Sequence, residues 1–367
     1  MPHRVAGLEA AIPTPVAAST AARPLARDGG RRLRRQRLEG WRQQLLHAGP
    51  VDVSVCIANW NCRDYLSQCL ESLLDYKQGV CLEVIVVDNA STDGAADMVE
   101  RDFPEVILVR NATNVGFARA NNQASRRAQG NYLFFLNNDT LIPAEALGQL
   151  LDFALAHPEA GIVGPRLCDA AGRTQVSYRL EPTLATLLHR TALLRWTGLL
   201  RGAYRRYRRN DFRTETTRPV EVLMGAAMLI PRAVFLNVGG WDEAFTFGGE
   251  DIDLSTRIRR NGQVIYHPDV EIVHYGRVST RQHIGFASSH MNIGFLRFLR
   301  KNGSGKLALI FYKLVVTLDL PIQIAAKWAQ FTLRRLQGQH VKAAKTRLAL
   351  RGLTHFLKHG MAAFWRT

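Results

Sequence analysis

Four short apolar runs follow one another along the chain after residue 50. They cover residues 53–58, 84–87, 106–109 and 132–136, and Ser54 is their one polar interruption. Each run is continuously apolar instead of alternating with polar residues, which is typical of strands buried on both faces of a parallel sheet. We therefore predict four parallel strands in this part of the chain.

Amphipathic helical patterns separate these strands. Between residues 65 and 74 the apolar positions fall on one face of a helix. Residues 93–101 follow Ser91 and Thr92, which are favourable N-cap residues, and the Ala-rich stretch 117–128 predicts a third helix. The alternation of strands and helices predicts a doubly wound α/β fold with a mostly parallel sheet and right-handed crossovers.

Further elements follow in the second half of the chain. Residues 162–165 and 220–230 predict two more strands, and residues 264–266 and 270–273 predict two short ones. Asp251–Arg260 predicts a helix, because carboxylates open the segment and arginines close it, as the helix dipole favours.

Polar side chains stand where the first four predicted strands end. They are Asn59 after the first strand, Asp88 and Asn89 after the second, Arg110 and Asn111 after the third, and Asn137, Asn138 and Asp139 after the fourth. Turns favour such residues, so one strand end alone would predict nothing. Ligands bind at the carboxyl ends of parallel strands, and four polar ends together therefore predict a binding site there.

The charge of the chain narrows the choice of partners. The 48 Lys and Arg residues outnumber the 31 Asp and Glu residues, which gives a formal charge of +17. This excess favours anionic partners such as nucleic acid, acidic lipid or a phosphorylated substrate. The arginines crowd into the first 42 residues and into the basic, partly helical segment 175–218. The five cysteines contain no C-x-x-C pair, which favours a reducing compartment over a disulfide framework or a zinc site.

Composition predicts three regions. Residues 1–50 form a basic extension, of which residues 1–30 are expected to be disordered and residues 38–46 to form a short amphipathic helix. Residues 51–285 form the α/β domain, and residues 286–367 form basic amphipathic helices. The N-terminus has no apolar core of a secretory signal.

The longest nearly apolar stretch, residues 307–331, is broken by Lys313, Asp319, Pro321 and Lys327. Charges at bilayer depth are costly, so we expect this stretch not to span a membrane. Its composition suits a helix that lies on anionic lipid or packs its apolar face on the protein core.

The order of several short motifs resembles that of family 2 glycosyltransferases of the GT-A fold, and among them bacterial rhamnosyltransferase-like enzymes. The resemblance covers roughly residues 52–280. Its segments are residues 55–61, 87–94, 114–118 with Asn121 and Asn122, 136–139, 240–243, 250–254 and His274. It implies the GT-A variant of the doubly wound sheet, with a small antiparallel part and C-terminal amphipathic helices.

The resemblance also implies a donor site and a metal site. The residues expected to bind the nucleotide-sugar donor are Ala58, Asn59, Asp88, Asn114, Gly116, Asn137 and Asn138. Asp139 and His274 resemble ligands of Mg²⁺ or Mn²⁺. Asn137 stands where the family has the first acid of its metal motif, so it would act through water or through the sugar. His274 could instead be a structural histidine, and His267 is a weaker candidate for the same role.

Asp251 resembles the general base of an inverting transfer, and Glu250 would orient Asp251 or bind the acceptor. Asp242 and Gly225 are the expected acceptor contacts, although Asp242 could simply fix its Gly-rich loop. For Asp253 we expect a cap of the helix that follows.

The resemblance thus implies a metal-dependent, inverting glycosyltransferase in cell-surface polysaccharide synthesis. It favours dTDP-L-rhamnose as donor, with UDP- and GDP-sugars left open. The acceptor would be a saccharide, lipid-linked, at the inner face of the cell membrane, where the basic protein is expected as a cytoplasmic, peripheral enzyme.

Three alternatives come from other classes of protein. A catalytically silent, membrane-associated scaffold would explain Asn137 in the metal motif. A nucleic-acid binder would explain the charge, but the chain has no zinc-finger spacing or RNA-recognition motif. A nicotinamide-dependent oxidoreductase would need G-x-G-x-x-G after the first strand, where residues 58–62 contain no glycine.

Overall fold

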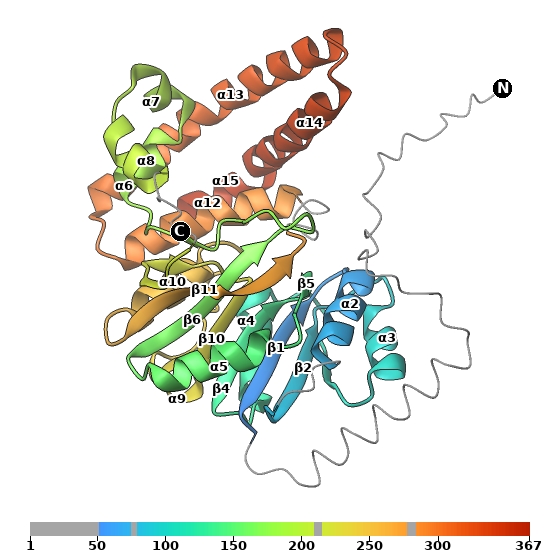
Figure 1. Ribbon diagram of the computed structural model, residues 1–367. Coiled ribbons are helices and arrows are strands. Elements are labelled where there is room, and N and C mark those ends of the chain that lie inside the picture. Colours follow the sequence, from blue (N-terminus) through green and yellow to red (C-terminus); the bar gives the residue numbers. More distant parts are fainter. Residues whose placement is uncertain (1–50, 75–78, 209–214, 277–283) are drawn as a thin grey trace, which may run out of the picture. The chain divides into compact units, whose positions relative to one another are not determined.

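The computed structural model describes residues 51–74, 79–208, 215–276 and 284–367 (Figure 1). The N-terminal extension, with its predicted amphipathic helix at residues 38–46, lies outside the described residues. Gly49–Thr367 form one compact unit, in which the α/β part and the C-terminal helices share contacts.

The four predicted parallel strands are confirmed. They are β1 (Val53–Asn59), β2 (Leu82–Asp88), β3 (Ile107–Arg110) and β4 (Tyr132–Asn137), and they lie in the order β3-β2-β1-β4. The register pairs Asn59 with Asp88 and Ala58 with Asn137. The polar ends of three strands therefore meet at one edge of the sheet, as the sequence predicts.

The sheet continues beyond β4 with mixed strand directions. The further strands are β5 (Thr140–Leu141), β6 (Ala160–Cys168), β8 (Arg218–Pro219), β10 (Ala227–Pro231) and β11 (Gln263–His274). β10 runs antiparallel to β4 and β6, while β11 runs parallel to β6 and antiparallel to β5 and β8. Among the described residues a separate small sheet pairs β7 (Tyr178–Arg179) with β9 (Val222–Leu223). The predicted fold class, a mainly parallel sheet with an antiparallel part, is confirmed.

Two strand predictions were wrong in detail. The predicted strand 220–230 is divided into β9 and β10, because residues 224–226 leave the ladder between two different sheets. The two predicted strands after residue 263 form the single strand β11, in which a bulge between His267 and Glu271 absorbs the irregular pattern. Bulges of this kind re-aim side chains near functional sites.

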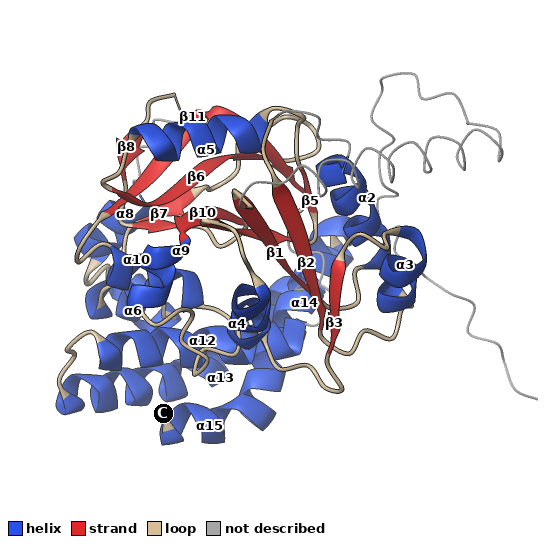
Figure 2. Ribbon diagram, turned by 90° about the horizontal axis from the view of Figure 1, so that it is seen from below, coloured by secondary structure: helices blue, strands red, loops and turns tan. Residues whose placement is uncertain are grey.

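Helices cover both faces of the sheet. They are α2 (Arg63–Leu74), α3 (Ala95–Asp102), α4 (Phe117–Arg127), α5 (Ala146–Ala156), α9 (Arg232–Asn237) and α10 (Glu250–Ile258). Figure 2 shows α4 and α5 on opposite faces, as expected for a doubly wound sheet. The predicted caps of α3 were wrong: Gly94 is the N-cap residue, and the Ser91 hydroxyl instead bonds Asn59 at 3.2 Å.

The predicted helices of the C-terminal region are present and form a second core. They are α12 (Ile284–Lys301), α13 (Lys306–Leu336), α14 (His340–His355), the short π-helix η1 (Phe356–Gly360) and α15 (Met361–Arg366), joined by α6 (Leu184–His189), α7 (Ala192–Thr197) and α8 (Arg201–Arg208) from the basic mid-chain segment. Leu296, Phe356 and Phe364 lie at the centre of this core. Ile252 of α10 belongs to the same cluster, so the helical layer packs directly onto the helix that carries Glu250 and Asp251.

Candidate active site

A cleft of about 380 Å³ is lined by polar and ionisable residues from the α/β part and by Met291 and Phe295 of α12. The predicted site residues that line it are Asn137, Gly225, Glu250, Asp251 and His274. They come from the end of β4, the turn before β10, the start of α10 and the end of β11. Segments far apart in the sequence therefore meet here.

Asp139 pairs with His274, which lines this cleft. The Asp139 Oδ1 atom is 3.3 Å from His274 Nε2, and both side chains are largely buried. The Asn137 amide nitrogen is also 3.3 Å from His274 Nε2. The pairing of β5 with β11, in which His274 is opposite Thr140, brings the two residues together.

Gln175 determines which nitrogen of the neutral His274 ring carries the proton. Its Nε2 atom donates to the backbone carbonyl of His274 at 2.6 Å, which orients the amide. The amide oxygen then faces His274 Nδ1 at 3.0 Å and can only accept a proton from it. The proton of the neutral ring therefore sits on Nδ1, and the Nε2 lone pair can accept from the Asn137 amide N–H, with the Asp139 carboxylate at the same distance.

A carboxylate oxygen and an imidazole lone pair that face one another form a donor set for a divalent cation. No group of three or more His, Cys, Asp or Glu side chains converges within the described part of the chain. Asp139 and His274 therefore fit a cation that takes its remaining ligands from substrate phosphates and water, as Mg²⁺ and Mn²⁺ sites in nucleotide enzymes do.

Asp251 opens α10 and is held in place on two sides. Arg179 Nη2 donates to both of its carboxylate oxygens at 2.7 Å. The Ile252 backbone N–H donates to Oδ1 at 2.9 Å. The helix begins at Gly249, whose φ of 100° lies in the left-handed region that favours glycine. This turn aims the first two residues of α10 into the cleft.

Glu250 is buried beside Asp251. Burial, and then the negative charge of Asp251, raise the pKa of Glu250 to about 8. Its Oε2 atom has no hydrogen-bond partner. At neutral pH the Glu250 carboxyl group is therefore mostly protonated, and the two adjacent acids do not both carry charge at the floor of the cleft.

The nucleotide-binding candidates form a buried hydrogen-bonded chain. The Asn59 amide nitrogen donates to Asp88 Oδ1 at 3.0 Å, and the Asn138 amide nitrogen donates to Asn59 Oδ1 at 2.7 Å. Asp88 Oδ2 accepts from the Ser91 backbone N–H at 2.9 Å. The chain links the carboxyl ends of β1, β2 and β4 and fixes the edge on which Ala58 lies.

Gly116 makes a close turn at the start of α4. Its N–H donates to the Asn114 side chain at 2.9 Å, and its φ is 87°. A Cβ at this position would lie 2.7 Å from the backbone oxygen of Thr246. Only glycine lets this turn and the Thr246 loop approach so closely.

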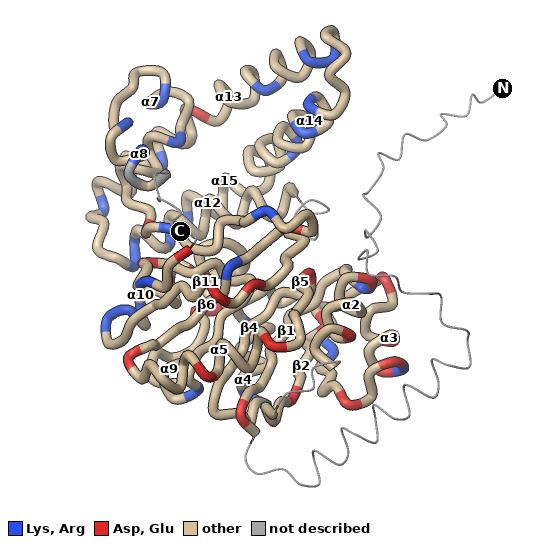
Figure 3. Tube along the Cα trace, viewed as in Figure 1, with Lys and Arg blue, Asp and Glu red and all other residues tan. Residues whose placement is uncertain are grey.

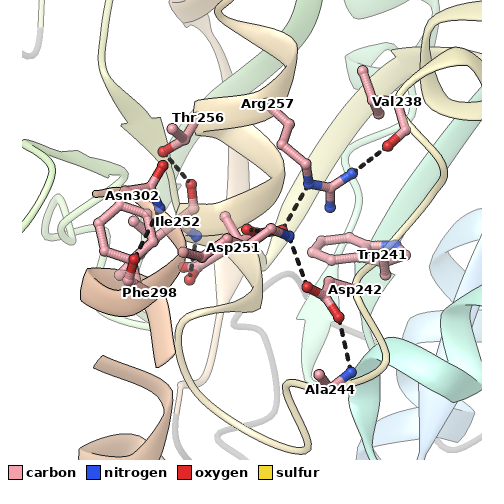
Figure 4. Close-up of polar contacts among 12 residues, drawn as sticks. Val238, Trp241, Asp242, Ala244, Asp251, Ile252, Thr256, Arg257, Phe298 and Asn302 are labelled. Atoms are coloured by element: carbon pink, nitrogen blue, oxygen red, sulfur yellow. Dashed lines mark hydrogen bonds and ion pairs between the residues drawn. The ribbon is translucent and has the colours of Figure 1, made fainter. Parts of the chain in front are cut away.

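Asp242 and Asp253 belong to an ion-pair network outside the cleft. Lys301 Nζ lies 2.7 Å from both Asp242 Oδ2 and Asp253 Oδ1. Arg257 Nε donates to Asp253 Oδ2 at 2.7 Å, and Figure 4 shows Arg257 donating to the Val238 carbonyl as well. The predicted helix cap at Asp253 was wrong, because Gly249 is the N-cap residue and Asp253 pairs with the arginine one turn ahead.

Asp242 does not line the cleft. Its carboxylate accepts hydrogen bonds from Lys301 Nζ and from the Ala244 N–H. The loop-fixing role that the sequence left open fits this placement. The same loop is held by Asn122, whose amide exchanges hydrogen bonds with the backbone of Trp241 at 2.8 and 3.0 Å. His267 is remote from this chemistry, since it stacks on Phe153 and bonds Thr217.

Sequence reasoning missed two residues of the cleft, Gln175 and Arg179. Both lie in the basic segment that the sequence describes only as partly helical. Arg179 lies in β7, which is only two residues long, and Gln175 lies in the loop before that strand, so no periodic pattern could have revealed either residue.

Two family models and several known proteins match the sequence of this chain. Residues 54–226 match the family model of glycosyl transferase family 2, and residues 210–283 match the N-terminal domain of galactosyltransferase. The N-acetylglucosaminyl-diphospho-decaprenol L-rhamnosyltransferase of Mycobacterium tuberculosis is 29% identical over 212 residues, which are 54% of this chain and 68% of that protein. The O-antigen biosynthesis protein RfbC of Myxococcus xanthus is 26% identical over 64% of this chain and 18% of its own length.

Solved structures share the fold. A mannosyltransferase from Pyrobaculum calidifontis in complex with GDP-Man and Mn²⁺ superposes with a TM-score of 0.50 at 20% identity, over 92% of this chain and 94% of that one. GalNAc-T7 with UDP, GalNAc and Mn²⁺ gives a TM-score of 0.52 at 17% identity, over 69% and 48% of the two chains.

Fold, cleft and relatives together define a nucleotide-sugar glycosyltransferase of the GT-A type. Residues 54–226 are a family 2 glycosyltransferase domain, and the protein is rhamnosyltransferase-like.

Proposed function

We propose that this protein transfers one sugar, with inversion, from a nucleotide-sugar donor to a hydroxyl group of a saccharide acceptor. The observation that carries the proposal is that Asp251 shares a cleft with Asn137 and His274. A candidate base and a candidate cation site therefore face one donor-sized space. The donor we favour is dTDP-L-rhamnose, because a relative is a rhamnosyltransferase.

The donor would lie along the carboxyl edge of the sheet. Asp88 and Asn59 offer a pre-ordered carboxylate and amide for the base and ribose, beside the backbone of Ala58. Asn138 links that network to β4, and the turn of Asn114 and Gly116 offers backbone groups to the diphosphate. Asn137 would contact the sugar from the end of β4.

Asp139 and His274 would hold a Mg²⁺ or Mn²⁺ ion. Such an ion neutralises the charge that grows on a departing diphosphate. Support comes from the facing lone pairs of the two side chains and from the Mn²⁺ named with two structural neighbours. Gln175 would keep Nε2 of His274 available, which is how a hydrogen-bond partner behind a ligating histidine acts.

Asp251 would act as the general base. One of its oxygens takes the proton from the acceptor hydroxyl, whose oxygen bonds to the anomeric carbon as the bond from that carbon to the diphosphate breaks. Attack on the face opposite the leaving group inverts the configuration, through an oxocarbenium-like transition state. A base placed in this way contributes roughly 10²–10⁴-fold to the rate.

The acceptor would enter beside Gly225. A Cβ at Gly225 would lie 3.4 Å from the Cβ of Asp251, so this position borders the base directly. A lipid-linked saccharide is the acceptor class that we favour, since a relative's name contains a diphospho-decaprenol acceptor. We place the reaction in cell-surface polysaccharide synthesis, at the inner face of the membrane, because relatives include an O-antigen biosynthesis protein.

The test is a panel of nucleotide sugars, with and without Mn²⁺, in which release of nucleoside diphosphate is followed. We expect turnover with dTDP-L-rhamnose and its loss on chelation. A silent scaffold is the second candidate, favoured by Asn137 in place of an acid. It would bind donors without any hydrolysis or transfer, and detectable nucleoside diphosphate release would exclude it.

A further inference from the structure

Helix α13 has two unlike faces. Leu309, Tyr312, Asp319 and Leu320 are buried on one face, where α13 packs against α14, α6, α7 and α12. The opposite face is exposed and apolar. α13 is also the one helix in the described part of the chain that is long and apolar enough to cross a membrane.

The exposed residues follow one line along the helix, which we call the outer stripe. Its large members are Leu307, Phe311, Leu314, Leu318, Trp328 and Leu336, with exposed fractions of 83%, 52%, 47%, 66%, 62% and 81%. They are spaced at helical intervals, and Pro321, Ala325 and Thr332 fill the remaining positions of the line. No charge interrupts the stripe over about 43 Å, given a rise of about 1.5 Å per residue.

The C-terminal segment that carries the stripe is strongly cationic. The basic residues of 284–367 are Arg297, Arg300, Lys301, Lys306, Lys313, Lys327, Arg334, Arg335, Lys342, Lys345, Arg347, Arg351, Lys358 and Arg366. The one carboxylate side chain of this segment, Asp319, is fully buried. Figure 3 shows Lys and Arg on α7, α8, α13 and α14, while Asp and Glu are frequent around the sheet and its helices.

Another exposed aromatic residue lies against α13, on a side of the helix away from the stripe. Trp196 of α7 is 71% exposed, and together with Arg195 it borders a groove whose other wall includes Lys327 and Gln330 of α13. Within the stripe itself, Trp328 follows Lys327, and tryptophan next to Lys and Arg on an apolar helix face is typical of the boundary between lipid headgroups and acyl chains.

We propose that α13 docks in the plane of an anionic bilayer, with the outer stripe buried at the headgroup boundary and Lys and Arg of the C-terminal segment on acidic lipid headgroups. The helix lies on the membrane and does not span it. A spanning α13 would have to leave α14 and expose the buried Asp319, and it would carry Lys313 and Lys327 into the hydrocarbon, which is costly.

Charge also decides against a second copy of the chain as the occupant. Two such faces would bring two cationic surfaces together, whereas each Lys or Arg near an anionic leaflet is favourable. The inference goes beyond the proposed function, because docking needs neither donor nor acceptor. Met291 and Phe295 of α12 line both the cleft and the cavity below α13, so docking would hold the cleft close to the lipid surface.

The experiment measures co-sedimentation of the full chain with vesicles of phosphatidylcholine alone or mixed with phosphatidylglycerol. We expect binding to the mixed vesicles. The double substitution Leu318→Glu with Trp328→Glu should weaken it by about tenfold or more, because both side chains lose their apolar burial. The matched control is Leu155→Glu with Leu236→Glu, whose side chains are 61% and 55% exposed. α5, which carries Leu155, lies on the sheet face opposite α12 and α13 (Figure 2).

The control should bind vesicles like the wild type, and all variants should keep their melting temperature. High salt and alkaline carbonate should release the bound protein, as for an in-plane helix. If the bound protein stayed on the vesicles in carbonate, the in-plane geometry would be overturned. If all variants bound the vesicles equally, the assignment of the outer stripe as the membrane-binding surface would be overturned. A dimer in sedimentation velocity that Leu318→Glu dissolves would assign the stripe to a second copy. None of these readouts depends on glycosyl transfer, so they are independent of the proposed function.

Discussion

Arg179 holds Asp251 by both carboxylate oxygens, each 2.7 Å from the same guanidinium nitrogen. The side chains are 21% and 11% exposed, so water screens the pair only partly. In the proposed mechanism one of these oxygens must receive the acceptor proton. Arg179 therefore has to release that oxygen when the acceptor hydroxyl enters, while it keeps the carboxylate aimed through the other.

Replacement of Arg179 by Gln should lower kcat by about tenfold or more, because the base loses the group that aims it. Donor affinity should stay unchanged, since the side-chain hydrogen bonds of Arg179 within the described structure go to Asp251 and not to the predicted donor edge. Steady-state kinetics and donor titration by calorimetry check both values. Arg179→Lys should recover part of kcat, because it keeps the charge but not the twofold contact. An equal loss of donor affinity would show a general disturbance of the cleft instead.

Asp251→Asn should abolish transfer, with a loss of about 10²-fold or more, because an amide cannot accept the acceptor proton. Donor and Mn²⁺ binding should persist, and transfer assays beside donor titration measure the two effects. Asp253→Asn is the control two residues away, where the carboxylate pairs with Arg257 and Lys301 outside the cleft. It should lower the melting temperature more than it lowers turnover at saturating substrate. Near-normal transfer by Asp251→Asn would remove the base assignment.

The sequence predicted those parts of the fold that rest on local patterns. The strands from β1 to β4 are apolar runs, and their polar ends meet because parallel strands in register place them at one edge. Asp251 and His274 were singled out because the short motifs stand in the same order as in family 2 glycosyltransferases. The periodicity of apolar residues alone would not have distinguished them.

Arg179, Gln175 and Lys301 could not be found in this way. Arg179 reaches Asp251 across 72 positions of the chain, and Lys301 joins Asp242 across 59. Such pairs depend on tertiary packing, and a basic segment looks the same whether its arginines face solvent or a buried carboxylate. For Asp253 the sequence likewise could not show the partner Lys301, which comes from a helix outside the motif.

Gln175→Leu should weaken Mn²⁺ binding by about 10–100-fold, the range typical for partners behind a ligating histidine. Without the amide, His274 can place its proton on either nitrogen and can rotate. Binding is measured by electron paramagnetic resonance of Mn²⁺ in the presence of nucleoside diphosphate, without turnover. Gln263→Leu, at the exposed far end of β11, is the control. If both variants bind Mn²⁺ like the wild type, His274 does not depend on Gln175.

The buried Glu250 should make stability depend on pH. Its pKa is raised from 4.5 to about 8, so the folded state binds a proton more tightly than the unfolded state does. Stability should therefore fall as pH rises between about 4.5 and 8, by on the order of a few kcal/mol. Glu250→Gln cannot ionise, so its melting temperature should decline less than that of the wild type between pH 6 and pH 9. If the melting temperatures of the two proteins declined equally between pH 6 and pH 9, a protonated Glu250 in the folded state would be contradicted.

Gly116→Ala should destabilise the protein by about 2–3 kcal/mol, because it adds a steric conflict to the cost of a positive φ. The new Cβ would meet the Thr246 backbone oxygen at 2.7 Å, and a backbone oxygen cannot swing aside as a side chain can. Gly172→Ala is the matched control, since Gly172 has a φ of 72° but open space around its Cβ position. It should cost about 1 kcal/mol, the penalty of the left-handed conformation alone. Urea unfolding of both variants measures the difference, and equal costs would mean that the close approach of the Thr246 loop contributes nothing.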